Sequence, residues 1–215
     1  MNDRYWNPGG NPDLKNEYNF TGEVSFDMKG NFSERAGFNA ELTTYAGRIH
    51  DMIQWLPGQS GYWSPQNISE SGTHGFETDM GFAYGFSHGY LRINTLYAFT
   101  RAYYLENKSI DSKKQIAYVP ENQFSLGIKA GFRKSYAGIN TCYTGKRYTT
   151  IENDTSLPGY TLTSLQAGYK IKAGISSFDF NFKAENIFGV NYEVIAYYPM
   201  PGRSFLLSLT YQFAR

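Results

Sequence analysis

A ten-residue segment near the C-terminus, Ser204–Phe213 with the sequence SFLLSLTYQF, repeats with a period of two. Alternate side chains of a β-strand point to opposite faces of the sheet, so this period predicts one apolar and one polar face. The apolar face is formed by Phe205, Leu207, Leu209, Tyr211 and Phe213. About ten residues is the length of a tilted β-strand that crosses a bilayer. The segment therefore favours a strand with lipid on one side and water on the other.

The composition of the 215 residues favours β structure over helix. Aromatic residues make up 18% of the chain, with 19 Tyr and 22 Gly, and charged residues make up another 18%. The net charge of +1 creates no field for a polyanion, so nucleic acid is not an expected partner. No apolar run reaches the roughly 18 residues of a membrane helix. The single cysteine, Cys142, excludes an internal disulfide.

Nine segments are predicted to be strands on this pattern. They are residues 18–29, 37–55, 75–84, 90–101, 123–133, 136–148, 160–172, 177–188 and 204–213. Residues 1–15 are expected to form an external loop. At the chain's charge fraction of 18%, roughly five of about thirty apolar-face positions in the six cleanest segments would be charged by chance. None is charged, as expected on a lipid face, where a Lys or Arg near the midplane costs about 2–4 kcal/mol.

The opposite face of the same segments carries charges of both signs. These are Glu23, Asp27, Lys29, Glu77, Asp79, Arg92, Lys129, Arg133, Asp179, Lys183 and Glu185. A water-filled barrel interior accepts such residues. A soluble β-sandwich also alternates, with its apolar face inward, so alternation alone leaves both architectures open.

The lengths of the connections favour the barrel. Short connections at 30–35, 85–88, 134–135 and 173–176 alternate with long ones at 57–67, 104–122, 149–159 and 189–202. In bacterial outer-membrane barrels, short turns face the periplasm and long loops face the outside. With the C-terminus in the periplasm, every long connection falls on the external side. We therefore predict an all-β fold, an antiparallel transmembrane β-barrel.

The C-terminal motifs resemble those of TonB-dependent outer-membrane receptors. Such receptors close with an E-N-L-F-D-x-x-Y stretch, then a P-G-R loop, then a final strand that ends in Phe. The matching residues are Glu185, Asn186, Ile187, Phe188, Tyr192, Pro201, Gly202, Arg203 and Phe213. Gly189 stands where the family usually has Asp.

Three more motifs resemble the same family and occur in its order along the chain. GNPDLKNE at 10–17 is similar to N-P-D-L-K-P-E, with Asn16 in place of the second Pro. WSPQNISESGTHGF at 63–76 is similar to a segment that ends in G-[VF]-E, and YTGKRYT at 143–149 also fits. The resemblance covers essentially the whole chain.

This resemblance implies about nine strands from the C-terminal part of a 22-stranded barrel. Family members also have a signal peptide, a TonB box and a globular plug, and residues 1–215 are expected to lack the plug domain. Bacterial single-chain barrels have even strand numbers, and a nine-stranded arc leaves two bare edges. We therefore expect a C-terminal fragment or one chain of a split transporter. A small complete barrel of eight or ten strands is the alternative.

The function implied by the resemblance is energy-coupled uptake of a scarce ligand across the outer membrane of a Gram-negative bacterium. The ligand is a ferric siderophore, cobalamin or an oligosaccharide, and the sequence does not choose among them. The implied partners are outer-membrane lipid, the rest of the barrel, the plug and a TonB-type periplasmic protein. A passive pore or adhesin and a soluble β-sandwich binding module are the alternatives.

Aromatic residues in the long connections are candidates for ligand binding, since flat rings suit such ligands. They are Trp6, Tyr62, Trp63, Tyr197 and Tyr198. Arg203, in the P-G-R loop, is a further candidate, with ordering of the external mouth as its other role. The aromatics Trp55, Tyr103 and Tyr104 are interpreted as an interfacial girdle. The resemblance also implies that Tyr211 and Phe213 belong to a signal read by the assembly machinery.

Nothing in the sequence indicates catalysis, a metal or a cofactor. The three histidines, His50, His74 and His88, are scattered without ligand spacing. The G-x-S-x-G, P-loop and H-E-x-x-H motifs do not occur. We therefore expect a protein that is not an enzyme.

Overall fold

The computed structural model describes residues 2–57, 62–67, 70–105 and 113–213. Within this part of the chain, nine strands form one antiparallel sheet in the order β1-β2-β5-β6-β7-β8-β11-β12-β13. Their bounds are β1 (Tyr18–Ser33), β2 (Ala36–His50), β5 (Ser71–Phe86), β6 (Gly89–Tyr104), β7 (Asn122–Phe132), β8 (Ser135–Thr144), β11 (Tyr160–Ala173), β12 (Ser176–Glu185) and β13 (Ser204–Phe213). The predicted all-β, antiparallel fold is confirmed.

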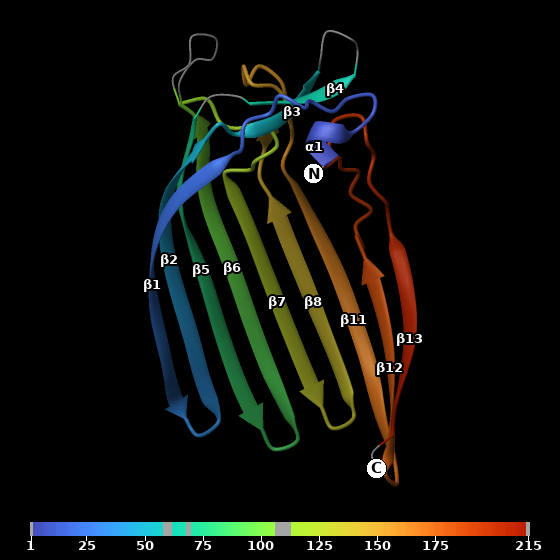
Figure 1. The fold of residues 1–215 in the computed structure, drawn as a ribbon. Coiled ribbons are helices and arrows are strands. Elements are labelled where there is room, and N and C mark those ends of the chain that lie inside the picture. Colours follow the sequence, from blue (N-terminus) through green and yellow to red (C-terminus); the bar gives the residue numbers. More distant parts are fainter. Residues whose placement is uncertain (1, 58–61, 68–69, 106–112, 214–215) are drawn as a thin grey trace.

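The connections are sorted between the two ends of the sheet (Figure 1). Tight turns join β1 to β2, β5 to β6, β7 to β8 and β11 to β12 at one end, here called the turn end. The long connections lie at the other end, here called the loop end. Two of them carry small hairpins, β3 (Ile53–Pro57) with β4 (Trp63–Asn67), and β9 (Arg147–Tyr148) with β10 (Ser156–Leu157).

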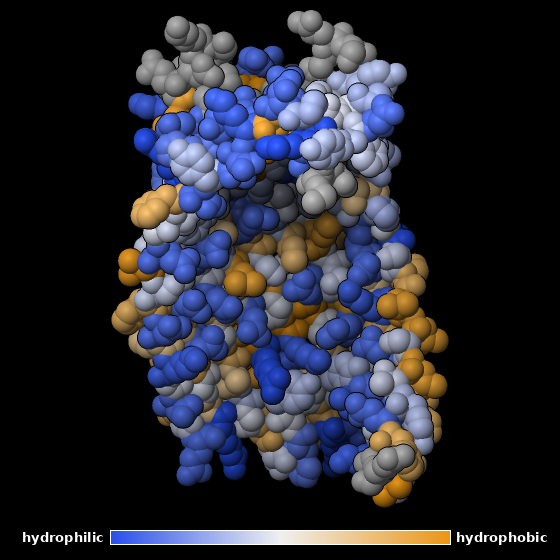
Figure 2. Space-filling view, in the orientation of Figure 1, coloured by the Kyte–Doolittle hydropathy of each residue, from blue (hydrophilic) through white to orange (hydrophobic). Residues whose placement is uncertain are grey.

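The register places the predicted polar and apolar positions on separate faces. Asp27, Glu41 and Asp79 lie opposite one another across β1, β2 and β5. Phe182 lies opposite Leu207 on the other face. Figure 2 shows many hydrophilic residues on the face seen in this view, and hydrophobic ones along the lateral edges, including the right-hand edge over β12 and β13. One face of each strand is therefore polar and the other apolar.

The apolar face is uncovered. Phe20 is 79% exposed and Leu207 is 78% exposed, and large apolar side chains on most other strands of the sheet are exposed as well. A contiguous apolar surface of this kind is foreign to a soluble monomer and suits a lipid environment. A β-sandwich would cover this face with a second large sheet, and among the described residues the other sheets have only two strands each. The soluble sandwich alternative is therefore wrong.

Three predicted strands are too long at the loop end. The segment 37–55 breaks after His50, because Asp51 adopts a left-handed backbone with φ of 50°, and β3 then pairs with β4 outside the main sheet. The segment 136–148 ends at Thr144, and its last two residues pair with β10 instead. The segment 177–188 ends at Glu185, since Asn186 turns the chain with φ of 47°.

The N-terminal segment 1–15 is not only a loop. It contains the short helix α1 (Asn2–Tyr5), and it is fastened to the β3–β4 hairpin. The Trp55 indole Nε1 donates to Asp3 Oδ1 at 2.9 Å, and Lys15 N donates to Asn67 Oδ1 at 2.7 Å. No helix among the described residues is long and apolar enough to cross a membrane.

Candidate ligand-binding site at the loop end

The buried core of the described chain lies at the loop end. Ala102, Tyr104 and Ile116 form a buried cluster, with Met52, Val119 and Ile151 packed against it. Tyr104 is fully buried, and its hydroxyl donates to Gln54 Oε1 at 3.0 Å. The girdle interpretation is therefore wrong for Tyr104, because its ring packs under the loops and not toward lipid. Three of the long connections therefore pack against this core, through Met52, through Ile116 with Val119, and through Ile151.

The side chain of Asn153 links two of the long connections by bonding the backbone of Gln115. Asn153 Oδ1 accepts from the Gln115 backbone N–H at 2.8 Å, and Asn153 Nδ2 donates to the Gln115 carbonyl at 2.8 Å. Gln115 is 1% exposed. Because each bond satisfies a buried backbone group, the two connections hold a defined position relative to each other.

Arg147 joins a third connection to this layer. Its Nη1 donates to the Glu193 carbonyl at 3.1 Å and its Nη2 donates to the Pro158 carbonyl at 2.9 Å. Its guanidinium lies over the Tyr160 ring, 4.8 Å from the ring centre. Arg147 is only 3% exposed, so these contacts compensate for a buried charge.

The connection between β12 and β13 is itself folded. The Asn186 side chain bonds both the N–H and the carbonyl of Val190 at 2.9 Å. At the tip, Tyr197 adopts a left-handed backbone with φ of 69°, and its N–H donates to Glu193 Oε2 at 2.9 Å. Non-glycine residues adopt this conformation at a cost, which the Glu193 side chain helps to offset. Tyr197 is 93% exposed.

These connections border an open cavity of about 940 Å³, here called the loop-end cavity. Its aromatic walls are Trp63, Tyr118, Tyr197 and Tyr198. Hydroxyl groups come from Thr149, Thr150, Thr155 and Ser156, and the remaining lining residues are Leu157, Glu193, Ile195 and Ala196. The only charged group of the described lining is the Glu193 carboxylate. Such a cavity offers flat apolar faces and hydroxyl groups.

The structure brings together three of the six predicted ligand-binding residues. Trp63, Tyr197 and Tyr198 line the loop-end cavity. Trp6 and Tyr62 are exposed and are not among its lining residues. Arg203 lies against Gly189, where a Cβ, if one were added to the glycine, would approach Arg203 Nε to 3.0 Å. Gly189 has φ of +64°, which explains why glycine suits this position.

Sequence reasoning missed several residues of the cavity. Tyr118 and Glu193 carry no motif or period that separates them from other loop residues. Tyr118 reaches the cavity through a backbone bond from its N–H to the Tyr148 carbonyl at 2.7 Å. Arg147, which links the connections but does not line the cavity, lies in the YTGKRYT motif, and this motif was its one available signal.

The two residues of the predicted assembly signal lie on the apolar face of β13. The rings of Tyr211 and Phe178 are in tilted contact with their centres 5.0 Å apart, and the Tyr211 hydroxyl lies 3.0 Å from Ser176 Oγ. Phe213 pairs with Ser176 at the turn end. Among the described residues, no group of three or more His, Cys, Asp or Glu side chains is arranged to hold a metal ion.

Comparison with known proteins places this arrangement in a family. The family model "TonB dependent receptor-like, beta-barrel" matches residues 1–187. The vitamin B12 transporter BtuB of Photobacterium profundum is 26% identical over 217 residues, which cover 99% of this chain and 33% of that protein. BtuB of Vibrio vulnificus is likewise 26% identical, over 219 residues and with the same shares. The chain thus spans about a third of these curated relatives.

A solved structure shows the same fold. The ferric-catecholate import receptor Fiu from K12 E. coli matches with a TM-score of 0.65 at 18% identity, over 92% of this chain and 28% of that one. With the family model matching most of its length, the chain belongs to the TonB-dependent receptors, as part of their β-barrel domain.

Proposed function

We propose that this chain is part of a transporter that captures a scarce ligand at the cell surface and takes it up with energy from a TonB-type periplasmic protein. The support comes from family membership and from relatives that transport vitamin B12 or import ferric catecholate. The observation that carries the proposal is the loop-end cavity, because residues from four separate connections line it together.

The chain is part of an outer-membrane protein of a Gram-negative bacterium. Its apolar face contacts outer-membrane lipid in this proposal, and its polar face lines the lumen of a 22-stranded barrel. The outer edges of β1 and β13 have no partner strand among the described residues. We propose that the remaining barrel strands cover these edges and that a plug domain fills the lumen.

The chemical groups that line the cavity favour some of the three candidate ligands over others. It presents four aromatic rings, the hydroxyl groups of three Thr, one Ser and three Tyr residues, and one carboxylate, without Lys or Arg. A polyanionic ferric catecholate finds no compensating charge among these groups. Cobalamin and oligosaccharides present flat faces, amides and hydroxyl groups, which such a lining complements. The chemistry therefore supports cobalamin or an oligosaccharide over an anionic ferric siderophore.

In the role proposed for them, Tyr211 and Phe213 guide insertion of the barrel by the assembly machinery. Arg203 keeps the last external connection in shape through its contact with Gly189. Trp6 and Tyr62 lie at the loop end, and they contact a ligand only if it extends beyond the loop-end cavity.

Calorimetry on the complete receptor tests the function and the ligand together. Titration with cobalamin, a ferric siderophore and a glycan panel should give binding for one class. The Trp63→Ala and Tyr197→Ala variants should each weaken that binding about tenfold or more, as loss of an aromatic anchor does. Tyr5→Ala is the matched control, because Tyr5 is 74% exposed and is not among the lining residues. Binding that survives both cavity variants would remove the loop-end cavity from the proposal.

A further inference from the structure

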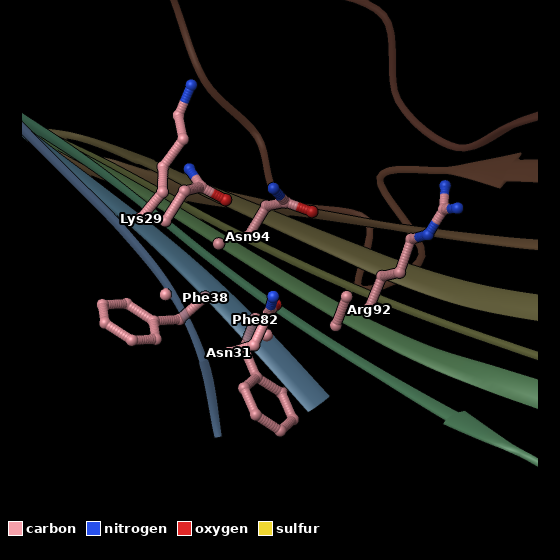
Figure 3. A pocket seen from close by; sticks show the side chains of 11 residues that line it. Lys29, Asn31, Phe38, Phe82, Arg92 and Asn94 are labelled. Atoms are coloured by element: carbon pink, nitrogen blue, oxygen red, sulfur yellow. The ribbon is translucent and has the colours of Figure 1, made fainter. Parts of the chain in front are cut away.

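The apolar face of the sheet carries two arginines near the loop end. Figure 3 shows the Arg92 side chain on one side of the sheet and the rings of Phe38 and Phe82 on the other. Arg48 and Phe38 are an even number of residues apart on β2, so they share a face. Arg101 and Arg92 are an odd number apart on β6, so they lie on opposite faces. Arg48 and Arg101 therefore both lie on the apolar face, where the two rings are.

The position of Arg48 corresponds to the outer border of the membrane. Ala36, at the turn end of β2, shares the apolar face with it. The two residues are about 40 Å apart along the strand, which is about 30 Å along the membrane normal at a tilt of about 40°. The apolar band of such barrels is about 25 Å tall, and their long loops face the outside. Arg48 therefore lies at the depth of the outer lipid headgroups, where a charge costs far less than at the midplane.

A groove opens on the apolar face around Arg48. It has a volume of about 340 Å³ and is here called the headgroup groove, and its lining includes Phe20, Arg48, Gly72, His74, Tyr103 and Leu105. Four of these residues are cross-strand partners in one row from β1 to β6, in the order Phe20, Arg48, Gly72 and Tyr103. A Cβ on Gly72 would lie 2.7 Å from Tyr103 Cζ and 2.8 Å from its hydroxyl oxygen. The hydroxyl end of Tyr103 therefore reaches across β5 toward Arg48.

Arg48 is held only loosely by its protein partner. Its Nη1 lies 3.7 Å from Glu70 Oε2, which is longer than a hydrogen bond, and its side chain is 57% exposed. The other oxygen of Glu70 lies 2.9 Å from His50 Nδ1. Arg101, in contrast, is tied to a connection, because its Nη2 donates to the Lys113 carbonyl at 2.8 Å. The guanidinium of Arg48 therefore keeps N–H donors that it can offer to a molecule in the groove.

We propose that the headgroup groove binds the phosphate group of an outer-leaflet lipid. The planar donors of Arg48 match two phosphate oxygens. The Tyr103 hydroxyl and the imidazole of His74, whose ring centres lie 5.7 Å apart, add hydrogen-bond donors beside it. Phe20, which is 79% exposed, gives the start of an acyl chain an apolar surface next to the guanidinium. The site lies on the lipid side of the sheet, away from the lumen and the loop-end cavity, so it goes beyond the proposed function.

Native mass spectrometry of the complete receptor in detergent, titrated with phosphatidic acid, tests the site. Diacylglycerol with the same chains and glycerol phosphate without chains should each bind about tenfold more weakly. Arg48→Gln should weaken phosphatidic acid binding about tenfold, the effect of losing charge-assisted hydrogen bonds. Arg48→Lys should weaken it less, because the charge remains. Lys15→Gln is the matched control, because it removes a cation that is 75% exposed and lies outside the groove lining, and it should leave binding unchanged.

Two outcomes would overturn the site. In the first, diacylglycerol binds the wild type as tightly as phosphatidic acid does, or Arg48→Gln binds phosphatidic acid as the wild type does, and the phosphate is then not recognised. In the second, glycerol phosphate binds as tightly as phosphatidic acid, and the groove then takes a soluble phosphate. Circular dichroism of each variant confirms that the barrel is folded before binding is compared. Binding of the transported ligand should be unchanged in Arg48→Gln, so failure of this site and failure of the proposed function are read separately.

Discussion

The sheet and the loop layer of this molecule follow opposite rules of burial. Along β1 and β13, almost every residue is exposed, including large apolar ones such as Phe20 and Leu207. The most deeply buried large side chains, Tyr104 and Gln115, belong to the loop end. The sheet is held by its ladder of backbone hydrogen bonds and by contact with lipid, whereas the loop layer is held by a small core and side-chain bonds. Substitutions in the sheet and in the loop layer should therefore destabilise the protein through different interactions.

The largest effect is expected in the loop core. Tyr104→Ala empties a fully buried site and removes the bond to Gln54, so it should destabilise the loop layer by about 3–5 kcal/mol. Limited proteolysis of the complete receptor should then cut the loops much faster. Tyr103→Ala, the neighbour on the opposite strand face, is the control and should change the cleavage rate little. Equal cleavage of both variants would contradict the loop core.

The second-largest effect is expected on β13, where a charge should cost more on the apolar face than on the polar face. Leu207→Arg places a charge on the apolar face and should cost about 2–4 kcal/mol if that face meets the middle of the bilayer. Ser208→Arg places the same charge on the polar face of the adjacent residue and should cost far less. The free energy of unfolding by urea in lipid bilayers measures both. A similar cost for the two variants would show that the lipid and lumen faces are assigned incorrectly.

A smaller effect is expected where the loops are tied together. Asn153→Ala removes two bonds to the Gln115 backbone and should destabilise the loop layer by about 1–3 kcal/mol, since the buried groups are left unpaired. Hydrogen exchange of the Gln115 amide measures the change directly. Glu152→Ala, an exposed neighbour, is the matched control. Unchanged protection of that amide in the Asn153 variant would show that the hydrogen bonds between Asn153 and the Gln115 backbone do not hold the two connections together.

The smallest effect concerns pH. The hydroxyl of Thr150 donates to Asp154, and this bond lowers the pKa of the carboxyl below its ordinary value. Because the folded pKa is below the unfolded one, the stabilisation is present above the unfolded pKa and is lost as pH falls through the folded pKa. Asp154→Asn should flatten this acid-side loss in a melting series from neutral pH to about pH 3. Since Asp154 is exposed, the change should be slight. An identical pH profile of the melting temperature in the variant would mean that this bond does not contribute to stability.

The period of two predicted most of the sheet because it is a local property of each strand. The segment 204–213 matches β13 from end to end, and 160–172 differs from β11 by one residue. Many of the boundary errors lie at the loop end, where Asp51 and Asn186 turn the chain with left-handed backbones. Neither residue is glycine, so the sequence offered no clear stop signal there. The segment 18–29, however, ends too early at the turn end, since β1 continues to Ser33.

The candidate site was predictable only in part. Aromatic residues in long connections pointed to Trp63, Tyr197 and Tyr198, but nothing local showed that they line one cavity. Tyr118 and Glu193 were missed because their positions depend on bonds between connections that are distant in sequence. Tyr104 was assigned to the membrane interface because Tyr and Trp commonly lie at headgroup depth, and only the strand face distinguishes it from Tyr103.

The amino-acid sequence by itself determined the strands, their two faces and the alternation of short and long connections. Each of these follows from side chains a few residues apart. Only the tertiary structure decided which loop residues meet in the cavity and that Arg92 stands opposite Lys129. The physical reason is that strand register and loop packing are set by hydrogen bonds between residues far apart in the chain, and no local pattern records those partners.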